Sequence, residues 1–331
     1  MRPELSRAGE RGAAKVIAVP VLLLIFLAGY VGHQAPPATH DDDSGSFQFA
    51  VDVPLVVLHV TVSDRQGGFV SDLGEQNFVV YEDGRPQPIR VFRNEDVSVT
   101  AGLIVDHSTT MRPRIAEVAA AARTFVQSSN PEDEMFVVNF NEKVRLGLPG
   151  TLRFTDNPAK LENAITGAIL GGQTALYDAI AKGLEELQAG SRDKKVLIVV
   201  SDGGDNTSSC SLAEVMSLAQ KSSAIIYTIG IFDPEDPDGN PGVLKRLAQA
   251  TGGEAFFPGQ ISEVVAICEH IARDIRHQYT LGYVPSNPAL DGSYRAVRVV
   301  AGSTGRDRLS VRTRAGYIAG GEPQPGKKSA K

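Results

Sequence analysis

Between residues 98 and 276, short apolar runs alternate with amphipathic stretches. A continuous apolar run is typical of a strand buried on both faces of a sheet, whereas apolar residues three and four positions apart form one face of a helix. Helical spacing occurs in the segments that contain Ile115, Leu176, Leu212 and Cys268. Strand-like runs occur at 98–105, 134–140, 194–201, 224–231 and 253–257, with a more polar one at 143–148. The pattern predicts an α/β fold with a doubly wound, mostly parallel sheet over residues 98–276.

Strand-and-turn patterns flank this segment on both sides. Residues 47–97 and 277–318 contain short apolar or alternating runs that are separated by turns, among them a Gly-Gly and an Asp-Gly turn. The strands of 47–97 alone are too few for a stable sandwich. We therefore expect both flanks to pair into one small β domain, with a linker at 36–46 before it and a disordered tail at 319–331 after it.

The first 35 residues resemble an export segment in composition. Four basic residues precede the uncharged, apolar run 16–32, and polar residues follow it. This order is typical of a signal peptide, and the run is close to the roughly 17–25 residues of a spanning helix. Residues 1–35 are therefore interpreted as a signal peptide or an N-terminal membrane anchor. We expect an exported protein, periplasmic or extracellular, or anchored in the inner membrane by this segment.

Composition narrows the classes of function. The chain is 42% hydrophobic and 22% charged, with a net charge of −6, as in an ordinary globular protein. It has no basic stripe with interleaved aromatic residues, which argues against nucleic acid as a partner. G-x-S-x-G, H-E-x-x-H and P-loop motifs are missing from the sequence, so we expect no enzyme; a metal-dependent hydrolase without a known motif is the alternative. His107 could reach a ligand, but an exposed loop residue is the favoured interpretation.

Two cysteines, Cys210 and Cys268, leave a disulfide open in an oxidising compartment. Cys268 lies on the apolar stripe of the last helical segment, which favours a buried, unbonded side chain.

Membrane contact is expected only through the N-terminal segment.

Oxygen-bearing side chains follow two of the predicted strands and precede one helix. Parallel strands place their carboxyl ends at one edge of a sheet, where ligands bind. Carboxylates and hydroxyls without imidazole or thiol groups suit a hard cation, Mg²⁺ or Mn²⁺. Because hydroxyls are neutral, the ion retains positive charge, and we expect the Asp or Glu carboxylate of a partner protein to complete its shell. The candidate metal ligands are Asp106, Ser108, Thr110, Thr174 and Asp202.

Each part of this set also has an interpretation without a metal. Asp106 and Ser108 could cap the helix that begins near Pro113, Thr174 could be a helix N-cap, and residues 201–206 could form a turn. None of these alternatives requires the three segments to converge. The acidic segment 232–241 faintly resembles a calcium loop but lacks its final Glu, so a solvated acidic loop is favoured.

The set Asp-x-Ser-x-Thr, a distant Thr and a distant Asp-Gly resembles the metal-ion-dependent adhesion site of von Willebrand factor type A domains. KKVLIVVSDGGDN, IIYTIGI and LKRLAQATGGEAFFPG are similar to this family too, so that the resemblance covers about 98–276. The flanks VTVSDRQGGFVSDLGEQNFVVYEDGRPQPIRVF and YTLGYVP resemble an exported bacterial group of such proteins, over nearly all of 47–318. The three-part motif is specific in this order, while any part alone is weak.

The resemblance implies a Rossmann-like fold and Mg²⁺-dependent protein binding. It implies that Ser108 and Thr110 ligate the metal directly, Thr174 and Asp202 directly or through water, and that Asp106 holds coordinating water and the loop. The family most often has Ser where Thr110 stands; Thr keeps the hydroxyl, and its methyl group could alter affinity or metal choice. The alternatives within this fold are a chelatase-like subunit that acts with an ATPase partner and a passive envelope structural protein.

Overall fold

The sheet of the central segment is mixed but mostly parallel. The computed structural model describes residues 55–232, 239–302 and 309–320, which belong to one compact unit. The strand order is β10-β9-β8-β5-β6-β7, and only β7 runs antiparallel to its neighbour. This confirms the predicted α/β fold. The strands are β5 (Val99–Asp106), β6 (Glu134–Phe140), β7 (Val144–Leu146), β8 (Lys194–Ser201), β9 (Ile225–Gly230) and β10 (Ala255–Phe256).

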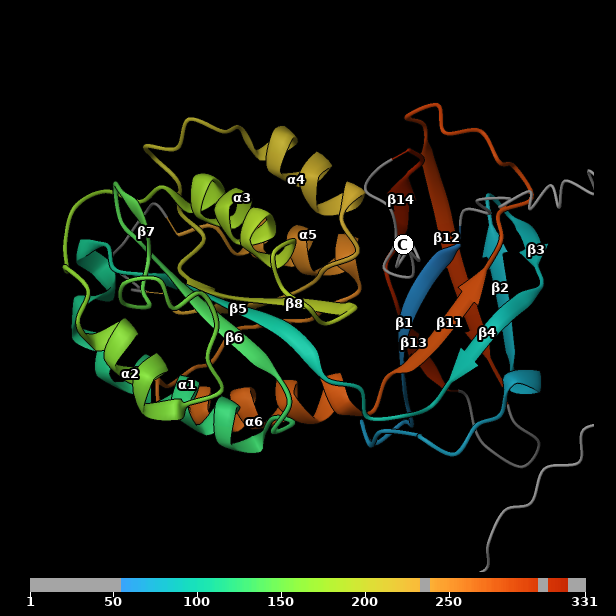
Figure 1. The fold of residues 1–331 in the computed structure, drawn as a ribbon, viewed down its shortest axis with the longest axis horizontal. Helices are drawn as coiled ribbons and strands as arrows, with labels where there is room; N and C mark the ends of the chain where they lie inside the picture. Colours follow the sequence, from blue (N-terminus) through green and yellow to red (C-terminus); the bar gives the residue numbers. More distant parts are fainter. Residues whose placement is uncertain (1–54, 233–238, 303–308, 321–331) are drawn as a thin grey trace, which may run out of the picture. The chain divides into compact units, whose positions relative to one another are not determined.

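Helices cover both faces of this sheet (Figure 1). On one face lie α1 (Ile115–Ser128), α2 (Pro158–Thr166) and α6 (Glu263–Arg276). On the other lie α3 (Leu176–Leu187), α4 (Leu212–Lys221) and α5 (Pro241–Thr251). The 3-10 helix η2 (Thr109–Arg114) connects β5 to α1. Every residue of β5 and β8 is buried, which explains why each strand contains a continuous apolar run and does not alternate.

Two of these helices, α2 and α5, are not among those that the sequence pattern predicts. Each begins at the Pro of an Asn-Pro pair, with the Asn as its N-cap. The Asn157 side chain accepts the backbone N–H of Lys160 at 3.1 Å, and the Asn240 side chain accepts that of Val243 at 3.3 Å. An Asn cap followed by Pro in the first turn is a strong helix start. This local signal could have identified both helices where apolar periodicity did not.

Strands from both flanks form two further four-stranded sheets, with the orders β13-β1-β11-β4 and β14-β12-β2-β3. In each, an N-terminal strand pairs antiparallel with a C-terminal one, as Val56 with Tyr283 and Glu82 with Val297. The strands are β1 (Val56–Ser63), β2 (Phe78–Glu82), β3 (Arg85–Gln87), β4 (Ile89–Arg93), β11 (Tyr279–Tyr283), β12 (Tyr294–Ala301), β13 (Ser310–Arg312) and β14 (Gly316–Ile318), with the 3-10 helix η1 (Glu75–Asn77) before β2.

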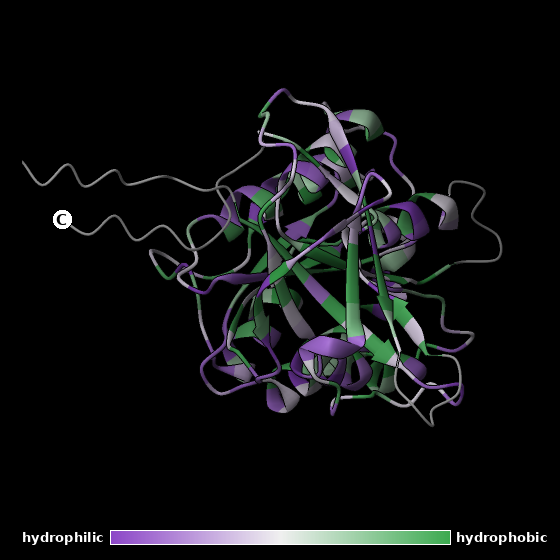
Figure 2. Ribbon diagram, turned by 90° about the vertical axis from the view of Figure 1, so that its right-hand side faces the viewer, coloured by the Kyte–Doolittle hydropathy of each residue, from purple (hydrophilic) through white to green (hydrophobic). Residues whose placement is uncertain are grey.

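The two sheets share one hydrophobic core, which contains Leu58 and Leu281 from one sheet and Val80 and Val299 from the other. Figure 2 shows the hydrophobic residues concentrated on strands, while most connecting loops are hydrophilic. The prediction of a small β part built from both flanks is therefore confirmed. The domain boundaries at 97/98 and 276/277 stay a prediction.

Buried polar side chains join the β part to the α/β part. Asp274 of α6 is 0% exposed and accepts hydrogen bonds from the hydroxyls of Thr61 at 2.6 Å and Tyr227 at 2.7 Å. Arg312 of β13 pairs with the same carboxylate and also donates to the Gly252 carbonyl at 2.7 Å. Burial of a carboxylate costs much free energy unless the group is paired and hydrogen-bonded in this way. The junction is thus specified by polar groups of both parts.

Lys194, at the start of β8, is a buried cation near this junction. Its ammonium group donates to the Ile275 carbonyl, and burial lowers its pKa from 10.5 to about 8, although Asp274 and other carboxylates oppose this shift. The folded state therefore favours the neutral amine. Below about pH 8 the amine is protonated in both the folded and the unfolded state, so Lys194 adds no pH dependence to the unfolding free energy there. Between about pH 8 and about pH 10.5 the unfolding free energy rises with pH, by about 3 kcal/mol in total.

Replacement of Lys194 by Met removes this pH dependence. Between about pH 7.5 and about pH 10 we expect the unfolding free energy of the wild type to rise by about 2 kcal/mol relative to Lys194→Met. Urea unfolding of both proteins at the two pH values measures the difference. The same pH dependence in both would show that Lys194 is not buried as described.

Several expectations concern residues outside the described part of the chain: the segment 1–35, the linker 36–46, residues 233–238 of the acidic loop and the tail beyond residue 320. Among the described residues, no helix combines the length and the hydropathy needed to cross a membrane. Cys210 and Cys268 are both free, and Cys268 is buried as its place on the apolar stripe predicts.

Candidate metal centre

Asp106 is the last residue of β5 and is completely buried. One carboxylate oxygen accepts the backbone N–H of Ser108 at 2.8 Å, and the other accepts the hydroxyl of Ser201 at 2.7 Å. The first bond turns the chain sharply after the strand, and the second joins β5 to the end of β8. Asp106 thus fixes the backbone on which the next hydroxyls stand.

The hydroxyls of Ser108 and Thr110 lie side by side, 3.1 Å apart. Thr110 in turn donates to a carboxylate oxygen of Asp202 at 2.9 Å. Asp202 directly follows β8, and its other oxygen accepts the N–H of Gly204 at 2.9 Å. Two segments about 90 residues apart in sequence therefore place two hydroxyls and a carboxylate in one hydrogen-bonded chain.

Thr174 reaches the same edge of the sheet through its backbone. Its N–H donates to the Asn206 side chain at 2.9 Å, and its carbonyl accepts the N–H of Asn206 at 3.0 Å. Just before it, Gly171 donates its N–H to the His107 carbonyl at 2.7 Å. The loop 171–175 is therefore anchored to both of the other segments. The hydrogen bonds that join Asp106, Ser108, Thr110 and Asp202 do not include the Thr174 hydroxyl.

The glycine pair in this loop explains its close approach. Gly171 and Gly172 have φ angles of 111° and 92°, a region that side-chain-bearing residues rarely adopt. A Cβ on Gly172 would lie 2.4 Å from a carboxylate oxygen of Glu142. The exposed Glu142 side chain could move away from such a Cβ, so the positive φ angles are the main reason that glycine is favoured here.

The alternative roles as helix caps do not describe what these residues do. Ser108 is the N-cap of η2 but makes no side-chain capping bond, and α1 begins only at Ile115. α3 begins at Leu176 with Ala175 as its N-cap, two residues after the expected start at Thr174. Instead, the Ser108 hydroxyl lies 3.1 Å from the Thr110 hydroxyl, and the Thr110 hydroxyl donates to Asp202.

Electrostatics favour a cation at this cluster. Burial, and to a lesser extent the nearby Asp202, raise the pKa of Asp106 from 3.8 to about 6, against hydrogen bonds from Ser108 and Ser201 that lower it. Asp202 itself is only 3% exposed. Two carboxylates with little water around them are an unfavourable arrangement that a bound cation relieves.

The donor set has the chemistry of a hard-cation site: carboxylate and hydroxyl oxygens, and no thiol. No three His, Cys, Asp or Glu side chains in the described ranges are grouped so that they could hold a metal. A site here therefore depends on the hydroxyls of Ser108 and Thr110 as well as on carboxylates. The residues present fit a divalent ion that retains part of its water shell.

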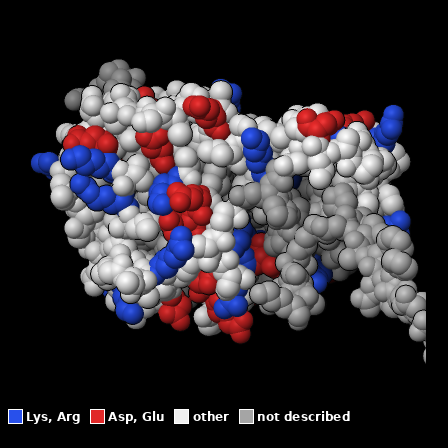
Figure 3. All heavy atoms as spheres, turned by 45° about the horizontal axis from the view of Figure 1, so that its top comes forward, with Lys and Arg blue, Asp and Glu red and all other residues white. Residues whose placement is uncertain are grey.

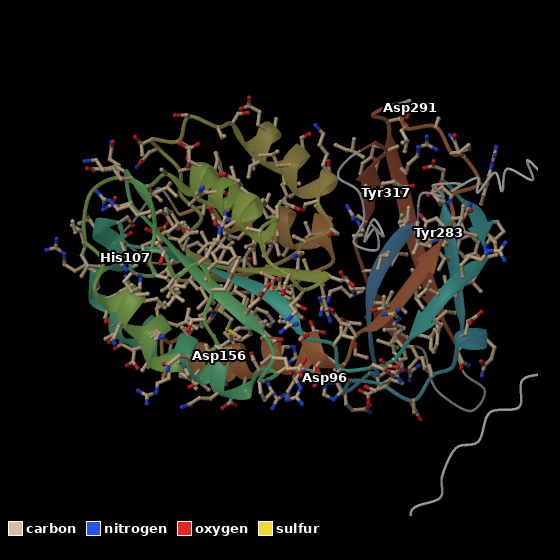
Figure 4. The ribbon with its side chains drawn as sticks, in the orientation of Figure 1. Asp96, His107, Asp156, Tyr283, Asp291 and Tyr317 are labelled. Carbon is tan, nitrogen blue, oxygen red and sulfur yellow. The ribbon has the colours of Figure 1, made fainter. Side chains whose placement is uncertain are left out.

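Sequence reasoning was wrong about His107 and missed two supporting residues. His107 is 1% exposed, not an exposed loop residue, because its ring nitrogens lie 3.0 Å from the Val105 carbonyl and 2.9 Å from the Ile165 carbonyl. Figure 4 shows it at the end of the α/β part that faces away from Tyr283 and Tyr317 of the β part. Ser201 and Asn206 stand beside the Asp-Gly motif, and that position is the signal that could have identified them.

Residues 102–266 match the family model of the von Willebrand factor type A domain. No match was found among curated proteins. Among solved structures, a von Willebrand factor type A protein from Catenulispora acidiphila is 14% identical, over 82% of this chain and 75% of its own, with a TM-score of 0.48. The vWF domain of the type V pili tip protein Mfa5 from Porphyromonas gingivalis is 15% identical, over 54% of this chain and 95% of its own, with a TM-score of 0.46.

Proximal thread matrix protein 1 from the mussel byssus, with a zinc-occupied MIDAS motif, is 17% identical, with a TM-score of 0.47. The similarity covers 57% of this chain and 48% of the mussel protein. Domains of this family typically mediate protein interactions. The family-model match to residues 102–266 identifies the α/β part of the chain as a von Willebrand factor type A domain, and its cluster of carboxylates and hydroxyls lies at the carboxyl ends of β5 and β8.

Proposed function

We propose that the α/β part binds Mg²⁺ or Mn²⁺ at its strand ends and uses the ion to hold a carboxylate of a partner protein. The supporting observation is the chain of hydrogen bonds that runs from Ser108 through Thr110 to Asp202. In it, two neutral hydroxyls and one carboxylate converge within hydrogen-bond distance at the edge of a parallel sheet, where such folds bind ligands.

In this proposal Ser108 and Thr110 are direct ligands, because their oxygens already lie 3.1 Å apart. Asp202 and Thr174 ligate directly or through water, and Asp106 orients coordinating water and the loop. Octahedral Mg²⁺ commonly keeps several waters and needs only a few protein oxygens. Hydroxyl ligands carry no charge, so the ion keeps an affinity for an outside carboxylate, and an Asp or Glu of the partner displaces one water.

The function is binding and not catalysis. Domains of this family are generally interaction modules. His107, which adjoins the cluster, is 1% exposed, and both of its ring nitrogens lie within hydrogen-bond distance of backbone carbonyls, so it is poorly placed for general acid–base work. We therefore propose an adhesion or interaction module without an enzymatic step.

The test is metal-dependent capture of a partner. Full-length wild-type protein and Asp202→Ala are immobilised and exposed to a cell-envelope extract in Mg²⁺ or in EDTA. We expect a retained protein that EDTA releases, that Mg²⁺ restores, and that Asp202→Ala does not retain. Asp193→Ala is the matched control, since Asp193 is an exposed acid at the opposite end of β8. Capture that is equal in EDTA would instead support a passive structural role.

We also propose that the protein is exported by residues 1–35, as a cleaved signal or as an anchor in the inner membrane. The support is the order of basic, apolar and polar segments there. Fractionation of cells that express the chain with and without residues 1–35 tests this. A full-length protein found in the cytoplasm would contradict export and would favour the chelatase-like alternative with an ATPase partner.

A further inference from the structure

A pocket of about 320 Å³ lies beside the candidate metal centre. Its walls come from the end of β6, the edge strand β7, and the last turn of α2 with the loop that follows. His107, which stands between Asp106 and Ser108 in sequence, forms part of its lining. The volume lies at the lower end of the range of small-ligand sites, about 300–1,000 Å³.

Two cations, Lys143 and Arg145, stand on the rim of this pocket. Both are exposed, and neither forms an ion pair with another residue in the described part of the chain. None of the described residues that line the pocket is acidic. Figure 3 shows several Lys and Arg side chains at the left-hand end of the molecule, the end at which β7 lies in Figure 1, with Asp and Glu side chains beside them. An anionic group would meet no carboxylate wall here.

The inner wall offers a polar group without a partner. The Asn139 amide nitrogen donates to the Ala164 carbonyl at 2.8 Å, while its oxygen is buried and has no hydrogen-bond partner among the described residues. A buried acceptor without a partner is costly and is usually satisfied by a donor from water or a ligand. A carboxylate cannot supply that donor, but a backbone N–H of a bound peptide segment can. Asn139 is 7% exposed and lines the pocket.

Apolar side chains complete the pocket and argue against a small inorganic anion as its occupant. Ile169 is 71% exposed and Leu146 is 46% exposed, and both are lining residues. Two large apolar side chains left in water at the mouth of a cationic pocket fit a ligand that carries both carbon and charge. A peptide segment with an acidic side chain has this combination.

We propose that this pocket binds a second acidic residue of the same protein partner, whose first acidic residue is held by the metal. This inference rests on the proposed function, because it assumes a partner that presents carboxylates. Lys143 and Arg145 attract the second carboxylate, Ile169 and Leu146 contact the adjoining side chains, and the pocket selects among partners that the metal alone does not distinguish.

The test uses full-length protein labelled at the Ile δ1 methyl groups, with Ile169→Val to assign the Ile169 signal. Acetyl-Ala-Glu-Ala-amide is titrated in EDTA, so that the metal centre takes no part. We expect the peptide to shift the Ile169 signal at millimolar concentration. The Gln analogue carries no charge and should bind at least about fivefold more weakly, a difference of about 1 kcal/mol in binding free energy.

Reversal of the charges at Lys143 and Arg145 tests whether these two cations bind the peptide. Lys143→Glu/Arg145→Glu should abolish the shift, whereas Lys245→Glu/Arg246→Glu, exposed on α5, changes net charge equally and should leave it intact. No shift, equal shifts with the Glu and Gln peptides, or an equal shift with inorganic phosphate would overturn the proposal. Because EDTA is present throughout, a failure of Mg²⁺ binding would leave this result unchanged, and the two failures are distinguishable.

Discussion

Replacement of Asp274 by Ala is expected to lower the unfolding free energy by about 3–5 kcal/mol, the effect of breaking a buried, hydrogen-bonded ion pair. The carboxylate is 0% exposed and is bound by Thr61, Tyr227 and Arg312. Its removal leaves two buried hydroxyls without their acceptor and a guanidinium group without its main partner. Lys194 also loses a nearby negative charge.

The effect should be measured by urea unfolding at neutral pH, with Arg123→Ala as the control. Arg123 pairs with Glu162 at 2.8 Å, but its side chain is 50% exposed, so its loss should cost only about 0–1 kcal/mol. We further expect Asp274→Ala to unfold less cooperatively, because the β part and the α/β part lose their polar junction. A loss below about 1 kcal/mol, with one sharp transition, would show that the junction is held by apolar packing instead.

The second large effect concerns the metal. Excess Mg²⁺ should stabilise the wild-type protein, by about 2.7 kcal/mol at a free concentration one hundred times the dissociation constant. Ser108→Ala/Thr110→Ala should lose this stabilisation completely. Without metal the same variant should differ from the wild type by only about 0–2 kcal/mol, the cost of two hydroxyls at a turn. Thermal unfolding with Mg²⁺ and with EDTA separates the stabilisation by the metal from the cost of losing the two hydroxyls.

Thr109→Ala is the matched control, because Thr109 stands between the two hydroxyls, is exposed, and donates weakly to the Gly172 carbonyl at 3.3 Å. It should keep its response to Mg²⁺. If Ser108→Ala/Thr110→Ala responded to Mg²⁺ as strongly as Thr109→Ala does, these hydroxyls would not be ligands.

The long central strands were predictable because burial on both faces leaves a continuous apolar run. β5, β6 and β8 begin and end within one residue of their predicted limits. α2 was not predicted because it is short and buries only Leu161, Ala164 and Ile165, too few to form a periodic stripe. For such helices the Asn-Pro start is a better signal than apolar spacing.

The position of the candidate site followed from the same rules. Oxygen-bearing residues at the ends of parallel strands meet at one edge, and the structure brings Asp106, Ser108, Thr110 and Asp202 together there. The burial of His107 could not be deduced, because its partners are carbonyls of Val105 and of Ile165, the latter 58 residues away. Contacts to backbone carbonyls leave no mark in side-chain patterns.

The most direct test of the central claim is isothermal titration of Mg²⁺ into metal-free wild-type protein and into Asp202→Ala. We predict one saturable site in the wild type and an affinity at least about 100-fold lower in the variant, since even supporting residues around a metal commonly account for 10–100-fold. The metal-free variant should be as stable as the wild type or slightly more so, because Asp202 lies close enough to Asp106 to raise its pKa. Equal binding of Mg²⁺ by both proteins would contradict a metal centre at Asp202.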